Sequence, residues 1–109
     1  MKFLCLASDL DNNQSKGFEI ENSEAVFLVK KSDQIYGYQN HCPHLGVNLE
    51  WKEDQFLDST DTLIQCAMHG ALFSVESGLC VSGPCRGQNL KTIELHQDSD
   101  DKIFLVSND

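Results

Sequence analysis

Two short segments of this chain each place one cysteine and one histidine close together. One residue separates Cys42 from His44, and two residues separate Cys66 from His69. A glycine follows within two residues of each histidine, and glycine permits the sharp backbone turns of a tight loop. Two thiolates and two imidazoles are the ligands of a two-iron, two-sulfide centre in which histidines replace two of four cysteines. The pattern therefore predicts a metal-cluster site formed by two loops, with these four residues as its ligands.

The segments C-P-H-L-G at 42–46 and C-A-M-H-G at 66–70 resemble the two ligand loops of the Rieske iron–sulfur protein family. The resemblance implies one [2Fe-2S] cluster, with Cys42 and Cys66 on one iron and His44 and His69 on the other. It also implies a third loop, which matches the Gly-Pro pair in 82–87 and which covers the cluster and limits the access of water.

A structural zinc site is the competing interpretation of the same four residues. Zinc is held by two cysteines and two histidines in many small domains, but paired ligands there are usually two to four residues apart. The single residue between Cys42 and His44 fits that spacing poorly. A coloured protein with a paramagnetic reduced state would distinguish iron–sulfur from colourless zinc.

Short apolar runs separated by Ser, Asp, Asn and Gly turns predict an antiparallel all-β chain. The expected strands are 2–7, 17–21, 25–31, 35–39, 49–51, 56–58, 63–66, 72–75, 79–81, 91–97 and 102–106, with a polar loop at 11–16 and one helical turn possible within 50–56. The family resemblance implies a β sandwich or barrel base with a small inserted cluster-binding β subdomain. A single domain, 1–109, would then have its base in 1–40 and 87–109 and its cluster-binding subdomain in 41–86.

Composition limits the partners that the chain can have. Its 109 residues fit one domain, and 17 acidic against 8 basic residues give a formal charge of −9. Such a charge repels nucleic acid and anionic membranes and favours a partner with a basic docking face, for which Glu50, Glu53 and Asp54 are candidate contacts. No apolar run is long enough to span a bilayer, and the first residues do not resemble a secretory signal. We therefore expect a cytoplasmic protein.

The remaining cysteines are expected to be thiols of a reducing compartment. Five cysteines are an odd number, which argues against a secreted disulfide framework. Two are assigned as ligands, and three are left over: Cys5, Cys80 and Cys85. A disulfide between Cys80 and Cys85, which flank the Gly-Pro loop, is the alternative. Trp51 is expected to pack in the core rather than to relay electrons.

The residues left after ligand assignment exclude two catalytic roles. A terminal Rieske oxygenase needs a second iron held by two histidines and a carboxylate. Only His41 and His96 remain, and they are expected to be a surface residue and a structural strand residue. The chain also has no G-x-G-x-x-G segment, so bound NAD or flavin is not expected.

We therefore assign no catalytic residue and expect a one-electron carrier. Its expected place is the ferredoxin component of an oxygenase or related redox system, with a reductase as donor and an oxygenase or other redox enzyme as acceptor. Two alternatives stay open: a small subunit resembling that of nitrite reductase, and a redox-sensing or structural interaction module.

The resemblance also predicts a low reduction potential. High-potential Rieske proteins carry a disulfide between the ligand loops, but Val47 and Met68 occupy the matching positions here. They also carry a serine and a tyrosine whose hydroxyls donate to cluster and cysteine sulfur, where this chain has Ala71 and Phe73. Donors to sulfur stabilise the reduced state. Their loss predicts a potential near the low end of the Rieske range, about −150 mV.

Overall fold

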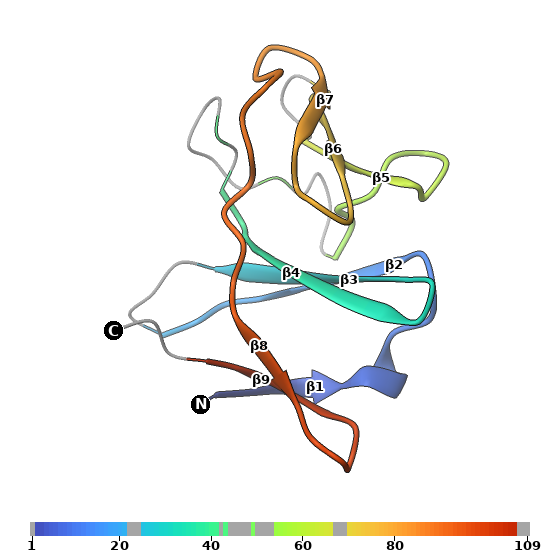
Figure 1. The fold of residues 1–109 in the computed structure, drawn as a ribbon, viewed down its shortest axis with the longest axis vertical. Coiled ribbons are helices and arrows are strands. Elements are labelled where there is room, and N and C mark those ends of the chain that lie inside the picture. Colours follow the sequence, from blue (N-terminus) through green and yellow to red (C-terminus); the bar gives the residue numbers. More distant parts are fainter. Residues whose placement is uncertain are drawn as a thin grey trace.

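The computed structural model describes residues 2–21, 25–41, 43, 49, 54–66 and 70–106. Within these residues the chain forms three antiparallel sheets of three strands each, stacked along the long axis of the molecule (Figure 1). In chain order the elements are β1 (Lys2–Leu6), the 3-10 helix η1 (Ala7–Asp9), β2 (Gln14–Phe18), β3 (Val26–Lys31), β4 (Gln34–Gln39), β5 (Leu63–Gln65), β6 (Leu72–Ser74), β7 (Cys80–Ser82), β8 (Leu95–Gln97) and β9 (Lys102–Leu105). The prediction of an antiparallel all-β fold is confirmed.

The middle sheet has the order β2-β3-β4, and β3 is its central strand. The two residues of the β3–β4 turn, Ser32 and Asp33, both have positive φ, which suits a tight hairpin turn. The expected loop at 11–16 is partly wrong, because β2 already begins at Gln14. Gln14 pairs with Lys30, and Asn13 takes up the preceding turn with a φ of 66°.

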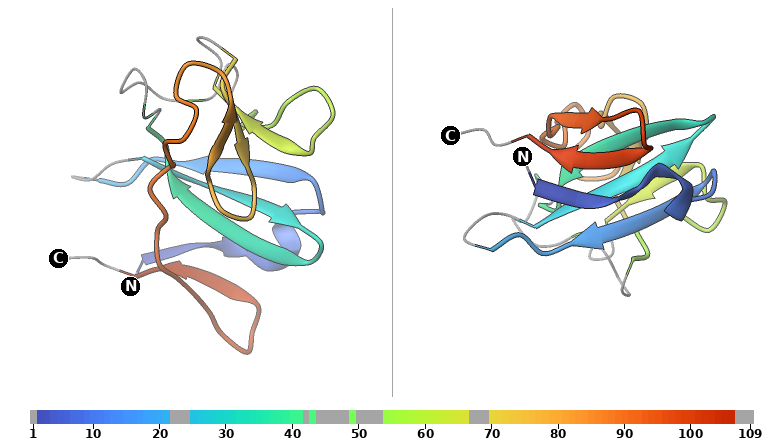
Figure 2. Two further views of the ribbon diagram at one scale, coloured as in Figure 1. Left: turned by 45° about the horizontal axis from the view of Figure 1, so that its top comes forward. Right: turned by 90° about the horizontal axis from the view of Figure 1, so that it is seen from below.

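The lower sheet has the order β1-β9-β8 and joins the two ends of the chain. The predicted hairpin around 98–101 is confirmed, with β8 paired antiparallel to β9. The expected strand at 91–97 is shorter than predicted, because β8 covers only Leu95–Gln97. The residues before it run along the edge of β4, where the N–H of Gln39 donates to the carbonyl of Lys91 (2.8 Å). Figure 2 shows from below how this sheet lies across the middle one.

The upper sheet, β5-β6-β7, is built from 63–82 and carries the second predicted ligand loop at the β5–β6 turn. The sequence also predicts strands at 49–51 and 56–58. Within 56–58, Leu57 makes only an isolated bridge to Ile64. Leu49 lies outside the strands, and Trp51 falls outside the described residues.

Two hydrophobic clusters fill the spaces between the sheets, and β3 contributes to both. Phe27 and Val29 point into the cluster below the upper sheet, whereas Leu28 points into the cluster above the lower sheet. A strand covered on both faces has a continuous apolar sequence, as these residues do. The ring of Phe27 stacks on that of Phe56 at 4.3 Å, which joins the middle sheet to the segment before β5.

In the described part of the chain, no helix has the length and apolar character needed to cross a membrane.

Candidate metal centre

The second predicted ligand loop is a closed turn between β5 and β6. The N–H of Cys66 donates to the carbonyl of Ala71 (2.9 Å), and the N–H of Gly70 donates back to the carbonyl of Cys66 (2.9 Å). Gly70 has a φ of +67°, the left-handed conformation that glycine adopts at low cost. Cys66 is 1% exposed. The turn therefore fixes the backbone of one predicted ligand at the end of a strand.

The first predicted ligand loop is closed at its base by a buried side chain. The N–H of Leu49 donates to Oδ1 of Asn40 (2.7 Å), and Asn40 is itself held by its N–H bond to the carbonyl of Ala25 (2.8 Å). These bonds bring together the residues on either side of 41–48. Cys42 and His44 lie outside the described residues, as does His69 of the second loop.

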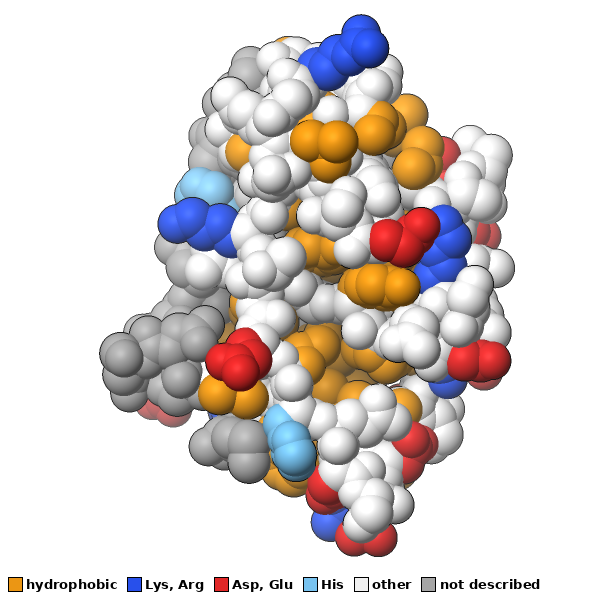
Figure 3. Space-filling view, in the orientation of Figure 1, with side chains coloured by type: hydrophobic (Ala, Val, Ile, Leu, Met, Phe, Trp, Pro, Cys, Tyr) orange, Lys and Arg blue, Asp and Glu red, His pale blue; other side chains and the backbone are white. Residues whose placement is uncertain are grey.

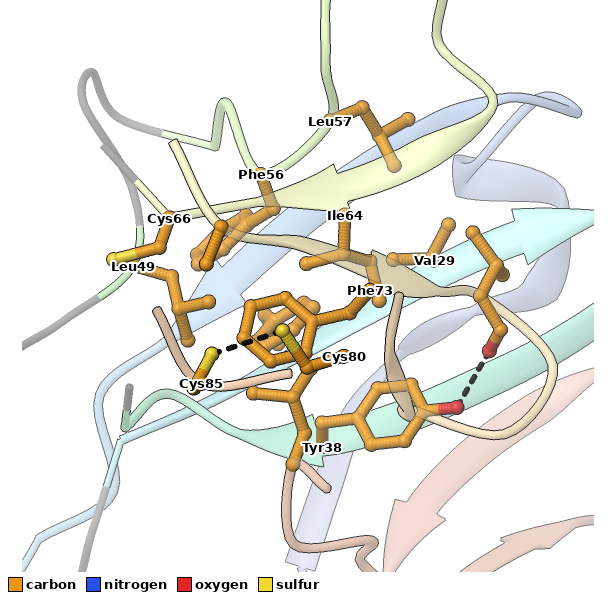
Figure 4. Close-up of a cluster of buried hydrophobic side chains, with 14 residues drawn as sticks. Val29, Tyr38, Leu49, Phe56, Leu57, Ile64, Cys66, Phe73, Cys80 and Cys85 are labelled. Carbon is orange, nitrogen blue, oxygen red and sulfur yellow. Dashed lines mark hydrogen bonds between the residues drawn. The ribbon is translucent and has the colours of Figure 1, made fainter. Parts of the chain in front are cut away.

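The described ends of both loops meet in one hydrophobic cluster. Leu49, Cys66 and Ala71 belong to the cluster below the upper sheet, and Cys85 of the third loop joins them. Figure 4 shows Leu49 and Cys66 at the same end of this cluster, with the side chain of Cys66 directed away from the rings of Phe56 and Phe73. The fold thus brings the bases of all three predicted loops to one place.

The third loop packs directly against the second. A Cβ placed on Gly83 would lie 2.8 Å from the Cα of Ala71 and 3.1 Å from its Cβ, and Gly83 has a φ of +106°. Only glycine meets both conditions without strain. The glycine of the predicted Gly-Pro loop therefore allows the close approach of this loop to the residue two positions after His69.

A further anchor follows the first loop and was not anticipated from the sequence. Asp54 accepts the N–H of Gly17 on Oδ1 (2.7 Å), and its carbonyl accepts the hydroxyl of Ser15 (2.6 Å). Both bonds tie the segment after the first loop to β2. Asp54 is therefore a structural residue, which weakens its earlier interpretation as a partner contact. Glu50 and Glu53, the other two candidates, lie outside the described residues.

The two positions that govern the predicted potential are buried. Ala71 is 1% exposed, and Phe73 is fully buried in the cluster beneath the upper sheet. Neither side chain carries a hydroxyl, so neither can donate a hydrogen bond to sulfur. Val47 and Met68, where the high-potential proteins have their disulfide, lie outside the described residues.

The remaining predicted residues take varied places. His41 is exposed at the end of β4, and His96 is exposed on β8, where its ring contacts Phe104. Cys5 is buried in the lower cluster, where burial raises the pKa of its thiol. Cys80 and Cys85 are both buried beside the third loop, and the thiol of Cys85 donates to the sulfur of Cys80 at a Sγ–Sγ distance of 3.0 Å.

A buried hydroxyl on β4, in the middle sheet, was not singled out by the sequence. The Tyr38 hydroxyl donates to the carbonyl of Val75 (2.5 Å) and so joins β4 to the turn after β6. Burial raises the pKa of Tyr38 to about 12, with smaller contributions from Tyr36 and Glu76. The phenol is therefore neutral at physiological pH and keeps its donor.

Charge is distributed unevenly along the molecule. Between 62 and 93 the sequence has one acidic residue, Glu76, and two basic ones, Arg86 and Lys91. Figure 3 shows acidic side chains gathered mainly over the lower part of the visible face and a hydrophobic patch over the upper part. Leu79 and Val81, which are 40% and 43% exposed, lie at β7. The acidic residues behind the net charge of −9 therefore lie mainly outside the part of the chain that carries the second and third loops.

The donor chemistry fits a [2Fe-2S] cluster of mixed ligation. Cys66 supplies a buried thiol on a fixed turn, and the sequence places two imidazoles and a second thiol in the two loops whose bases meet beside it. Within the described ranges no group of three potential ligands is present, and three of the four predicted ligands fall outside those ranges.

Comparison with known proteins agrees with the sequence motifs. The profile of a family described as the Rieske [2Fe-2S] domain matches residues 1–103. Cholesterol 7-desaturase of Caenorhabditis elegans is 31% identical over 74% of this chain, but the match spans only 18% of the desaturase. Ferredoxin CarAc of Metapseudomonas resinovorans is 27% identical over 75% of this chain and 72% of its own length.

Solved structures show the same fold. The ferredoxin of carbazole 1,9a-dioxygenase from Nocardioides aromaticivorans IC177 superposes with a TM-score of 0.72 at 19% identity, over 96% of this chain and 97% of its own. A chain from a complex of reduced oxygenase and oxidised ferredoxin of carbazole 1,9a-dioxygenase gives a TM-score of 0.75 at 22% identity, over 96% of this chain and 91% of its own. The chain belongs to the Rieske [2Fe-2S] domain family, as its two loop motifs predict, and its cofactor is one Rieske-type [2Fe-2S] cluster.

Proposed function

We propose that this chain is a one-electron carrier, which takes electrons from a reductase and delivers them to an oxygenase or a related redox enzyme. The cluster, when bound, accepts and releases one electron at a time. The observation that carries the proposal is the turn that fixes Cys66 at the end of β5, beside the closed base of the first loop. The match to ferredoxin CarAc over most of both chains supports the same role.

We assign Cys42, His44, Cys66 and His69 as the four ligands. The upper sheet with its loops, within 41–86, is the cluster-binding subdomain, and 1–40 with 87–109 forms the base. The base holds the loops in place through Asn40 and Asp54, while the Gly83 loop packs against the second loop. The chain itself needs no catalytic residue in this role, and we place the protein in the cytoplasm.

A pair of buried cysteines gives a matched test of the ligand set. Cys66 and Cys80 are 1% and 2% exposed and belong to the same cluster, so their replacement by alanine removes the same volume from one core. Cys66→Ala should abolish the visible spectrum and the electron paramagnetic resonance of the reduced protein, whereas Cys80→Ala should keep both. Retention of the full signals in Cys66→Ala would overturn the assignment.

The histidine ligands have controls of their own. His69→Ala should lose the native cluster, whereas His41→Ala and His96→Ala, at two exposed positions, should keep it. A native spectrum in His69→Ala would contradict the proposal. Iron, acid-labile sulfide and zinc should be measured in each purified variant, because zinc in place of iron would favour a structural site.

The second candidate is a fixed redox subunit of a larger enzyme. It is favoured by the desaturase match, in which a stretch like this chain occupies less than a fifth of a longer protein. Gel filtration of the protein from its native cells separates the two cases. A carrier should elute separately from its redox partners, whereas a fixed subunit should elute with its enzyme.

A further inference from the structure

Cys80 and Cys85 form a close pair of thiols that the proposed function does not use. Cys85 donates its S–H to the sulfur of Cys80 at 3.0 Å, and Cys80 donates in turn to the carbonyl of Ser82 (3.3 Å). Both side chains are at most 2% exposed. Figure 4 shows the two sulfur atoms pointing toward one another.

The backbone holds the two cysteines in place independently of their thiols. The N–H of Cys80 donates to the carbonyl of Gln88 (2.8 Å), and the N–H of Gln88 donates to the carbonyl of Cys85 (2.9 Å). The N–H of Gly87 donates to the carbonyl of Cys80 (3.3 Å). Because a disulfide bond is about 2.05 Å long, the sulfurs need to approach by only about 1 Å to become bonded.

We propose that Cys80 and Cys85 are a redox-active dithiol, which closes to a disulfide in the presence of a small-molecule disulfide oxidant such as glutathione disulfide. The thiolate of one cysteine attacks the oxidant, forms a mixed disulfide and releases one glutathione thiolate. The thiolate of the other cysteine then attacks the protein sulfur of that mixed disulfide and releases the second glutathione. Two protein thiols lose two electrons and two protons, and one glutathione disulfide becomes two glutathione molecules.

The loop between the cysteines controls access to them. Its four residues, 81–84, are all exposed, so the two buried cysteines stand at the two ends of one short surface segment. Local opening of one such loop costs less free energy than unfolding of the domain. The oxidant therefore reaches the pair without global unfolding, at a rate set by this opening.

Closure of the bridge acts on the metal centre through the same loop. Gly83 lies between the two cysteines and packs against Ala71, which is hydrogen-bonded to Cys66. A disulfide at the base of the loop restricts its opening and holds it against the second ligand loop. Loss of the cluster should therefore be slower in the oxidised form, and this second part rests on the proposed ligand role of Cys66.

Intact mass and peptide mapping test the dithiol directly. The cluster-loaded protein is equilibrated with glutathione disulfide, quenched in acid, denatured and alkylated. Before alkylation we expect a protein lighter by two hydrogen atoms. After alkylation we expect one disulfide between Cys80 and Cys85, while Cys5, buried in the other cluster, is recovered as an alkylated thiol. Full alkylation of both Cys80 and Cys85, or a glutathione on each, would overturn the proposal.

Variants and a second readout separate the two parts of the inference. In Cys80→Ser, Cys85 should stop at the mixed disulfide with glutathione, because the resolving thiol is absent; recovery of unmodified Cys85 would contradict the exchange. Bleaching of the visible spectrum in urea should be several-fold slower after oxidation of the wild type, whereas the oxidant should not slow it in Cys80→Ser. Equal bleaching rates of the reduced and the oxidised wild type would refute the stiffening of the loop. The mass data would still report the disulfide, because they do not depend on the stability of the cluster.

Discussion

Gly83→Ala tests the contact between the third loop and the second ligand loop. The new Cβ would lie 2.8 Å from the Cα of Ala71 and 3.4 Å from its N, so the obstacle is backbone and not a flexible side chain. The φ of +106° adds the cost of a left-handed conformation, about 1–2 kcal/mol for a residue with a Cβ. Overpacking of a close contact adds about 1–3 kcal/mol. The free energy of unfolding should fall by the sum of these two costs.

Gly87→Ala is the matched control in the same loop region. Gly87 has a φ of +90°, but a Cβ there would meet nothing within 4 Å, so this variant bears the conformational cost alone. The gain from a less flexible unfolded chain is the same for both substitutions and cancels in the comparison. Gly83→Ala should therefore be less stable than Gly87→Ala by about 1–3 kcal/mol.

Thermal unfolding of the two cluster-loaded variants, at one scan rate, measures this difference. A destabilisation of 1 kcal/mol lowers the Tm of a domain of this size by about 4–8 °C, so the two variants should be clearly resolved. Gly83→Ala should also bleach faster in the visible spectrum, because its loop is displaced from Ala71, while Gly87→Ala should bleach at nearly the wild-type rate. Equal Tm values and equal bleaching rates would refute the packing argument.

Substitutions at three further positions have expected outcomes. Tyr38→Phe leaves the carbonyl of Val75 without its hydroxyl donor, and urea unfolding should show a loss of about 1–3 kcal/mol; an unchanged midpoint would contradict this. Because the pKa of Tyr38 is raised to about 12, the contribution of its hydroxyl to stability is fully present below pH 10 and is lost as the pH rises through about 12. The difference in free energy of unfolding between the wild type and Tyr38→Phe should therefore become smaller over that range. Asn40→Ala removes the acceptor of the buried Leu49 N–H at the base of the first loop, and the cluster should bleach faster; a wild-type rate would show that the loop is closed by other means. Ala71→Ser adds a hydroxyl beside the second loop and should raise the midpoint potential, whereas Ala71→Gly, which adds no donor, should not; a potential unchanged in both would argue against hydroxyl control at this position.

The sequence predicts the parts of the fold that local patterns determine. The hairpin at 98–101 has segments of alternating apolar and polar residues on both sides of a polar turn, and the structure confirms it. The second loop sits at the end of a strand because 63–65 and 72–74 are apolar enough to pair. The family and its cofactor follow from the type, order and spacing of the ligands, which are all properties of the local sequence of the two loops.

Other features depend on contacts between distant residues and leave little trace in local sequence. Gln14 and Ser15 are polar, and their sequence predicts a loop. They nevertheless form part of β2, because they pair with Lys30 and Val29 of β3. The charge of Asp54 makes it a candidate partner contact, but its carboxylate accepts the N–H of Gly17, 37 positions away. Asn40 carried a usable signal, since an asparagine beside a loop commonly bonds to nearby backbone, but its partner is nine positions on.

Protein-film voltammetry of the wild-type chain tests the central claim most directly. A one-electron carrier with a Rieske-type cluster should give one reversible one-electron wave. Because Ala71 and Phe73 supply no hydroxyl to the centre, the midpoint should lie near about −150 mV rather than about +300 mV. A midpoint well above zero would contradict the inferred absence of hydrogen-bond donors, and a colourless protein with no wave would contradict the electron-carrier account itself.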